Sequence, residues 1–111
     1  MQVTIADEGS TARVALVGRL DILGAEAVAM PLATLSGAKQ NILIDMSQVN
    51  FLASIGIRHL VSATKALSRK GGQLILIGPQ DIVREVLTTA GLASMISMVG
   101  SDAEARAMLA N

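Results

Sequence analysis

The 111-residue sequence contains no cysteine, no tryptophan and no tyrosine, and Phe51 is its only aromatic residue. The absence of cysteine excludes disulfides, thiol redox chemistry and cysteine-ligated zinc. With one aromatic side chain, the sequence lacks the platforms on which nucleic-acid bases stack, and nine acidic residues balance its nine basic ones. We therefore expect no basic stripe for a phosphate backbone and no nucleic-acid binding. Because His59 is the single histidine, we expect no metal site.

Long apolar runs are also missing. None of them approaches the roughly 20 residues that a helix needs to cross a bilayer. The N-terminal segment carries Asp7 and Glu8 and has no basic region before an apolar core, so it does not look like a signal peptide. We expect a cytoplasmic protein without membrane insertion.

Hydrophobic residues, almost all aliphatic, make up 51% of the sequence, which suits buried strands covered by helices. The length predicts a single domain over residues 1–111. The apolar pattern predicts strands at 1–7, 11–18, 41–46, 73–77 and 95–99. It predicts helices at 24–35, 54–70, 81–90 and 102–109, with a kink or an early end at Pro31 in the first.

The resulting order β-β-α-β-α-β-α-β-α predicts an α/β fold. Its mixed sheet should be mostly parallel, with an antiparallel edge formed by the opening hairpin. Gly71-Gly72 should end the second helix, and Ser101 with Glu104 has the spacing of a capping box at the start of the last one.

Enzyme signatures are absent from the sequence. It has no GxGxxG, GxxxxGK[ST] or GxSxG pattern, and Gly71-Gly72 follows a helix, whereas a phosphate-binding loop precedes one. A serine nucleophile at Ser54 would need His59 as its base, but five helical positions turn the two side chains apart. We therefore expect no enzyme activity, no catalytic residue and no cofactor.

Ser54 lies where a strand leads into a helix, and its hydroxyl is open to three interpretations: a cap, a nucleophile or a phosphorylation site. The nucleophile is disfavoured for want of a base. The buried stripe of the helix should comprise Ile57, Leu60, Val61, Thr64 and Leu67, which leaves Ile55 exposed on the opposite side. Ser54 is expected to cap the helix. A phosphate there would face the positive end of the helix dipole, with Arg58 four residues on as a charge partner.

The sequence resembles the STAS domain, in the family of bacterial anti-sigma factor antagonists. Gly18-Arg19-Leu20-Asp21 is similar to a G-E-L-D turn of this family. Residues 42–47, then Val49, Phe51, Ser54, Gly56 and Ile57, are similar to its central block, roughly LDLS-x-V-x-F-x-D-S-S-G-L. Gly71-Gly72 and Ala90-Gly91-Leu92 also fit, so the similarity covers nearly the whole chain.

This resemblance implies a binding protein. Such proteins bind a cognate anti-sigma factor, a serine kinase with a GHKL-type ATP-binding fold, and so release a sigma factor. The kinase phosphorylates the first serine of D-S-S-G, which breaks the complex, and a PP2C-type phosphatase restores it. That serine corresponds to Ser54. The partner-binding residues implied by the resemblance are Asp21, Ile22, Ala53, Ile55, Gly56 and Arg58, with Gly56 leaving room for a partner to approach.

Three residues depart from the family pattern. Arg19 replaces an acid, Ala53 replaces the acid before the serine, and Ile55 replaces the second hydroxyl. Two alternatives stay open, and Ala53 and Ile55 motivate the first of them. One is a STAS scaffold or small subunit of a transporter or signalling complex, without a phosphorylation switch. The other is a small-molecule or nucleotide sensor, which the missing phosphate loop disfavours.

Overall fold

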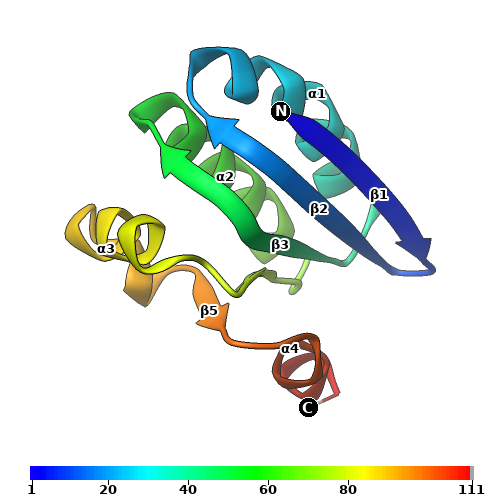
Figure 1. The fold of residues 1–111 in the computed structure, drawn as a ribbon. Coiled ribbons are helices and arrows are strands. Elements are labelled where there is room, and N and C mark those ends of the chain that lie inside the picture. The colour runs from blue at the N-terminus through cyan, green and yellow to red at the C-terminus, as the bar shows by residue number, and fades with distance from the viewer. Residues whose placement is uncertain (111) are drawn as a thin grey trace.

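A computed structural model describes residues 1–110 of the chain. It contains a five-stranded sheet, four α-helices and one 3₁₀ turn (Figure 1). In chain order the elements are β1 Gln2–Glu8, β2 Thr11–Leu20, α1 Ile22–Ala38, β3 Asn41–Leu52, α2 Ser54–Ser68, β4 Leu74–Ile77, α3 Asp81–Thr89, η1 Leu92–Ser94, β5 Ser97–Val99 and α4 Asp102–Leu109. The α/β order predicted from the sequence is confirmed.

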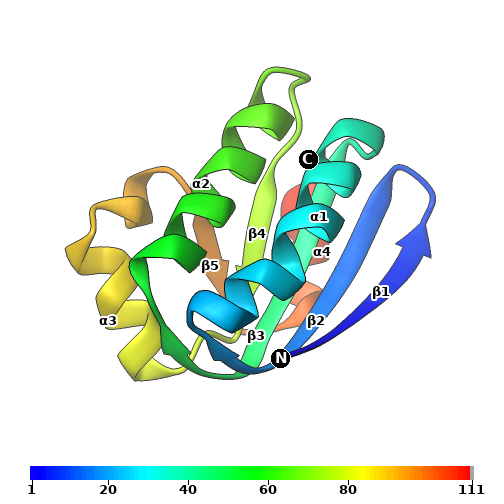
Figure 2. The same ribbon diagram turned by 90° about the horizontal axis from the view of Figure 1, so that it is seen from above.

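The strands lie in the sheet in the same order as in the chain, β1-β2-β3-β4-β5. β1 pairs antiparallel with β2, and the remaining pairs are parallel, so the predicted antiparallel edge is confirmed. Because successive right-handed crossovers all move in one direction, their helices must lie on one face. Figure 2 shows α1 and α2 side by side over this face, with α4 behind the sheet. The strand order never reverses, so the sheet has no switch-point crevice of the kind that binds nucleotides.

The main core lies between the sheet and helices α1, α2 and α3. Its fully buried residues include Leu16, Leu20, Ile44, Leu60 and Leu87. A smaller cluster on the other face packs the outer side chains of β3 and β4 against α4: Leu43, Ile75, Ile77 and Ala105. The central strands are therefore buried on both faces, as their unbroken apolar runs predict.

Helix α4 is held beneath the sheet by ion pairs as well as by this cluster. The Arg13 guanidinium donates to Asp102 at 2.9 Å and to Asp45 at 3.1 Å. The hydrogen bond from Arg13 holds the pKa of Asp102 below its ordinary value. At the start of the helix, the Ser101 hydroxyl accepts a hydrogen bond from the Glu104 amide at 3.2 Å, so the predicted cap is confirmed.

Helix α1 continues through Pro31 to Ala38, so the early end expected at this proline does not occur. Proline removes one hydrogen bond, the one to the carbonyl of Ala27, and Ala27 lies on the exposed side of α1, where water can take its place. Tertiary contacts close the helix further on. The Lys70 ammonium donates to the carbonyls of Ser36 and Lys39, both at 2.6 Å.

Strand β3 is the second difference from the prediction, which ended it at Met46. It extends to Leu52 because it stays paired with β2 as far as Leu20 opposite Leu52, with two register shifts on the way. Helix α2 ends near the expected glycines. Gly71 has a φ of 79°, and the Gly72 amide donates to the Leu67 carbonyl at 2.9 Å, so the predicted stop is confirmed.

Candidate functional site

The carboxyl ends of β2 and β3 lie together because the strands are parallel neighbours, and each leads directly into a helix. The Ala53 amide donates to the Leu20 carbonyl at 2.9 Å and joins the two ends. We call this region the Ser54 edge: residues 19–23, from β2 into α1, and residues 51–58, from β3 into α2. All the residues predicted to act in partner binding lie within it.

Ser54 is the first residue of α2 and does not cap it. The cap position belongs to Ala53, whose extended backbone has a φ of −98° and whose side chain cannot accept a hydrogen bond. The prediction of a Ser54 cap is therefore wrong, because the helix begins at Ser54 itself, one residue earlier than a cap at 54 would require. The Ser54 side chain is exposed and makes no hydrogen bond within residues 1–110. Its hydroxyl is free, beside first-turn amides that no side chain caps.

Gly56 and Ile55 have different roles from those expected. Gly56 is buried, and a Cβ there would come within 2.7 Å of Leu20 Cγ and 3.1 Å of Leu52 Cδ1. Its missing side chain thus lets α2 lie close on the strand ends, whereas the sequence interpretation reserved that space for a partner. Ile55 is half-buried, so it is less exposed than the helical periodicity predicts. The most exposed apolar side chains at this edge are instead Ile22 and Leu23, at 70% and 74% exposure, and Phe51 is exposed to a smaller extent.

Asp21 caps α1 by accepting a hydrogen bond from the Gly24 amide at 3.0 Å. This bond, and a second one from Arg19, hold the pKa of Asp21 below its ordinary value. The Arg19 guanidinium is 3.4 Å from Asp21 and lies over the Phe51 ring, 4.2 Å from its centroid. Arg19, which departs from the family pattern, is therefore tied to its neighbours. Arg58 is exposed and has no ion pair within residues 1–110.

A groove between α2 and α3 was not predicted from the sequence. Its walls are Ser54, Ile57, Ile82, Glu85, Val86, Thr89 and Ala90. The signal that could have found it is Ile82, an apolar residue in the first turn of α3 that remains 60% exposed. Ser54 therefore stands at the rim of a largely apolar groove.

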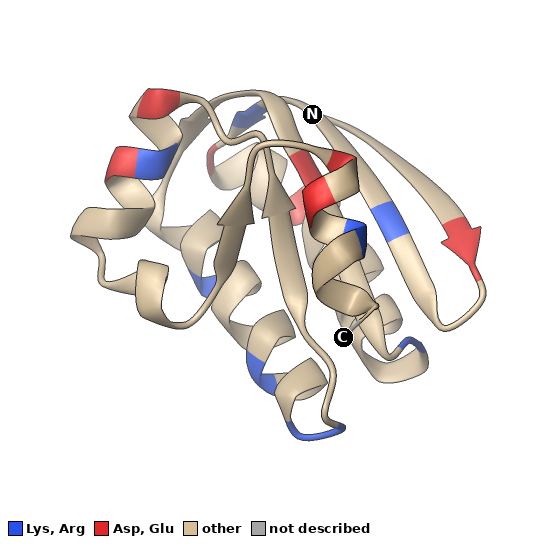
Figure 3. Cartoon of the chain, turned by 90° about the horizontal axis from the view of Figure 1, so that it is seen from below, with Lys and Arg blue, Asp and Glu red and all other residues tan. Residues whose placement is uncertain are grey.

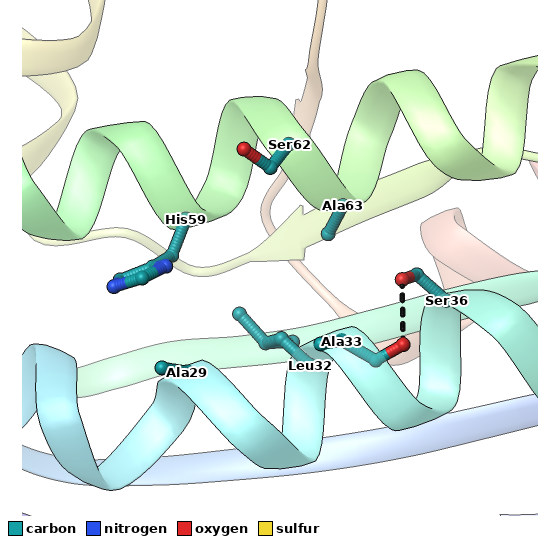
Figure 4. Close-up of a pocket in the computed structure, with 7 residues that line it drawn as sticks. All are labelled: Ala29, Leu32, Ala33, Ser36, His59, Ser62 and Ala63. Atoms are coloured by element: carbon teal, nitrogen blue, oxygen red, sulfur yellow. Dashed lines mark hydrogen bonds between the residues drawn. The ribbon is translucent and has the colours of Figure 1, made fainter.

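A second cleft lies between α1 and α2, where His59 extends from α2 toward α1 (Figure 4). The Ser36 hydroxyl in this cleft donates to the Ala33 carbonyl at 3.0 Å and is thus engaged by its own helix. His59 makes no hydrogen bond to Ser54 within the described part of the chain, so the pair lacks the arrangement of a nucleophile and its base. Residues 1–110 also contain no cluster of three potential metal ligands.

None of the helices in residues 1–110 combines the length and the apolar character needed to cross a membrane.

A family model described as the STAS domain matches residues 3–105. The fold is similar to that of the anti-sigma factor antagonist SpoIIAA in its unphosphorylated form, with a TM-score of 0.84 and 23% identity over 97% of this chain and 96% of that one. The phosphorylated form of SpoIIAA from Bacillus matches with a TM-score of 0.76 and 22% identity over 97% and 99% of the two chains.

Two further structures extend this comparison. The putative anti-sigma factor antagonist tm1081 from Thermotoga maritima has a TM-score of 0.90 and 18% identity over 98% of this chain and 95% of that one. The murine anion transporter Slc26a9 has a TM-score of 0.75 and 18% identity, with 96% of this chain matched to 19% of the transporter. No curated protein sequence matches the chain.

Proposed function

The chain belongs to the STAS-domain family, and we propose that it is an anti-sigma factor antagonist whose binding is controlled by phosphorylation of Ser54. In this proposal it acts in the cytoplasm by binding and has no catalytic activity of its own. Its partner is an anti-sigma factor that is a serine kinase of the GHKL ATPase type. Binding this kinase releases a sigma factor, and a PP2C-type phosphatase removes the phosphate from Ser54.

The observation that carries the proposal is the state of the Ser54 hydroxyl. It is exposed and free of hydrogen bonds within the described residues, and it is the first residue of a helix whose first turn contains no acidic side chain. A kinase can reach such a hydroxyl without unfolding the domain. The amides of the first turn and the positive end of the helix dipole would stabilise the phosphate that results.

The surroundings of Ser54 supply the surface that the phosphate would disrupt. Exposed Ile22 and Leu23 lie on one side, and the groove with Ile82 lies on the other. A partner that covers these apolar side chains would also cover Ser54. A phosphate adds a charge of about −1.5 to −2 at neutral pH, and burying that charge in an apolar contact is costly. We therefore expect phosphorylation to release the partner. Asp21, Ala53, Ile55 and Arg58 complete the proposed surface, and Gly56 shapes it from beneath.

The phosphorylation site is tested by incubating the protein with its cognate kinase and ATP, followed by intact mass measurement. Wild type should gain one phosphate and Ser54→Ala none. Ser62→Ala is a matched control, because Ser62 is also an exposed serine of α2. It should be phosphorylated as wild type is. An unmodified wild type, or equal modification of Ser54→Ala, would contradict the assignment.

The control of binding is tested with Ser54→Asp and Ser54→Asn, which differ in charge and hardly in size. Ser54→Asp should weaken binding to the kinase by about tenfold or more, equivalent to about 1.4 kcal/mol, and Ser54→Asn should weaken it much less. Isothermal titration calorimetry gives both dissociation constants. Equal effects of the two variants would mean that size matters there and charge does not.

A scaffold without a phosphorylation switch is the second candidate. Ala53 and Ile55, which replace an acid and a hydroxyl of the family pattern, favour it, and the fold also matches a segment of the transporter Slc26a9. This candidate predicts that Ser54→Asp changes no binding event. Co-purification with a transport protein, unaffected by Ser54→Asp, would support it against the first.

A further inference from the structure

The exposed side of α2 contains only serines and basic residues. From the first residue of the helix to its C-cap, the exposed positions are Ser54, Arg58, Ser62, Lys65, Ser68 and Arg69. At 100° per residue, the three basic side chains fall within about 40° of one another around the helix axis, and they span about 16 Å along it. We call Arg58, Lys65 and Arg69 the α2 basic stripe. Figure 3 shows basic and no acidic residues along this helix.

The three side chains of the stripe have no ion pair or hydrogen bond within residues 1–110. Most other basic residues of the described chain are engaged: Arg13, Arg19, Lys39 and Arg106 pair with carboxylates, and Lys70 donates to backbone carbonyls. Arg84 on α3 is the other exposed cation without a partner there. The zero net charge of the sequence thus conceals a local excess of positive charge on this helix.

Stability of the helix does not explain the whole stripe. Lys65 and Arg69 lie near the C-terminus, where the helix dipole favours cations, but they are also like charges four residues apart, which repel. Arg58 lies near the N-terminus of the helix, where the helix dipole does not stabilise a positive charge. The stripe therefore carries charge that the folded chain does not use.

We propose that the α2 basic stripe is a docking surface for an acidic face of a protein partner, and that phosphorylation of Ser54 weakens this docking. The inference rests on the proposed function, because Ser54 lies one turn from Arg58 on the same side of α2 and continues the stripe to the Ser54 edge. Complementary charge speeds association and selects among partners.

A protein surface fits the stripe better than a membrane does. Peripheral helices that bind membranes combine cations with apolar residues that enter the lipid, and α2 exposes no apolar residue between its cations. The stripe is also short beside the six to ten phosphate contacts typical of strong, salt-dependent DNA binding.

The same geometry explains why a phosphate would act against an acidic partner. Phosphoserine at position 54 would add about −1.5 to −2 at one end of a stripe that carries three positive charges. It would pair with Arg58, four residues away on the same side, and repel an acidic face. Neutralisation of the stripe and the cost of burying the phosphate both favour release.

The stripe is tested first without any kinase, by NMR titration of the ¹⁵N-labelled protein with a synthetic peptide rich in Glu and Asp. Amides of residues 58–69 should shift, and the Gln/Asn version of the peptide should leave them unmoved. The shifts should disappear in Lys65→Glu/Arg69→Glu and persist in Arg84→Glu, because Arg84 is exposed on α3 and does not line the groove between α2 and α3. Equal losses in the two variants would overturn the proposal, since net charge alone would then act.

Lys65→Gln/Arg69→Gln guards against misfolding, because it removes charge without reversing it and should lose the shifts too. Vesicles of phosphatidylcholine with phosphatidylserine, and a single-stranded oligonucleotide, test the other anionic surfaces. Binding to either of these without binding to the acidic peptide would overturn the proposal in favour of lipid or nucleic acid.

Calorimetry with the kinase then separates this inference from the proposed function. Lys65→Glu/Arg69→Glu should bind the kinase about tenfold more weakly at about 50 mM salt and less than about threefold more weakly at about 0.5 M, where screening is strong. If Ser54→Asp weakens binding and the double variant does not, the stripe is refuted alone. If the double variant weakens binding and Ser54 is never phosphorylated, the stripe stands and the phosphorylation switch fails.

Discussion

Helices α1 and α2 lie side by side on one face of the sheet (Figure 2). The side chains that they expose to solvent nevertheless differ. Glu26 is the only charged residue of α1, and its outer face exposes Ile22, Leu23 and Met30 at 70% or more. The exposed residues of α2 are serines and cations. The inner faces are alike, because both helices bury aliphatic side chains in the same core, against the same face of the sheet.

The difference shows that packing and recognition are set by opposite sides of each helix. A helix that is apolar all round normally lies inside a larger structure, so the outer face of α1 suits an apolar contact. The outer face of α2 suits an electrostatic one. Ser54 lies at the end where these two surfaces meet, which places it where a partner that uses both would be sensitive to an added charge.

The largest effect should come from the buried side of α2. Leu60 is fully buried and Met30 on α1 is 73% exposed. Leu60→Ala should lower the free energy of unfolding by about 2–5 kcal/mol, because it leaves a cavity, and Met30→Ala should change it by less than about 0.5 kcal/mol. Urea unfolding followed by circular dichroism measures both. A large loss in Met30→Ala would mean that the outer face of α1 is packed and that the comparison is mistaken.

The next effect separates the glycines at the two helix starts. A Cβ at Gly24 in α1 would lie 2.1 Å from the Arg19 carbonyl oxygen, whereas one at Gly56 in α2 would meet the Leu20 side chain at 2.7 Å. Backbone yields less readily than a side chain, so Gly24→Ala should cost about 2–3 kcal/mol of stability, and Gly56→Ala less, about 1 kcal/mol. Thermal unfolding would compare them. The reverse order would show that the Leu20 pocket is the more rigid of the two.

A gain is expected at the uncapped start of α2. Ala53 occupies the cap position and offers no acceptor, whereas Asp21 caps α1. Ala53→Ser should raise the free energy of unfolding by about 0.5–1 kcal/mol by supplying one. Ala33→Ser, in the middle of α1, is the control and should lower it by up to about 0.7 kcal/mol, because serine is the poorer helix former there. Chemical denaturation measures both, and a loss in Ala53→Ser would contradict the free first-turn amides.

The smallest effect concerns pH. Because the folded state lowers the pKa of Asp21, its carboxylate contributes stability that is present above its ordinary pKa, about 3.9, and is lost as pH falls through the lowered value. NMR should show the Gly24 amide titrating with a midpoint below 3.9. The Gly56 amide in α2, with no acidic residue in its first turn, should show no such titration. Asp21→Asn should abolish the change at Gly24. Its persistence in that variant would assign the titration to another group.

Most of the fold was predictable because its signals are local. Apolar runs marked the buried strands, and Gly71-Gly72 and Ser101 with Glu104 marked helix ends whose hydrogen bonds join neighbours in the chain. The extension of β3 to Leu52 and the passage of α1 through Pro31 were not predictable in this way. The extension of β3 depends on its pairing with β2. The last turn of α1 is held by Lys70, which follows α2 and donates to the Ser36 carbonyl.

The site was predictable to a smaller extent. The sequence pattern identified Ser54 as the residue of interest and placed it where a strand meets a helix. It assigned the helix cap to Ser54, whereas the cap position belongs to Ala53. It also predicted that Ile55 is exposed, whereas Ile55 is half-buried, because helical periodicity does not include the segments that surround the first turn. The groove between α2 and α3 was not predictable from local patterns, since its two walls are about 30 residues apart in the chain.

The sequence by itself determined the order of elements, the aliphatic core and the family, because these depend on residue type and spacing along the chain. The tertiary structure alone decided which charges remain unpaired and which apolar side chains remain exposed. Arg13 and Arg58 are the same residue type, yet Arg13 meets two carboxylates from distant segments and Arg58 meets none within residues 1–110. Pairing and burial depend on neighbours in space, and only the folded chain supplies those neighbours.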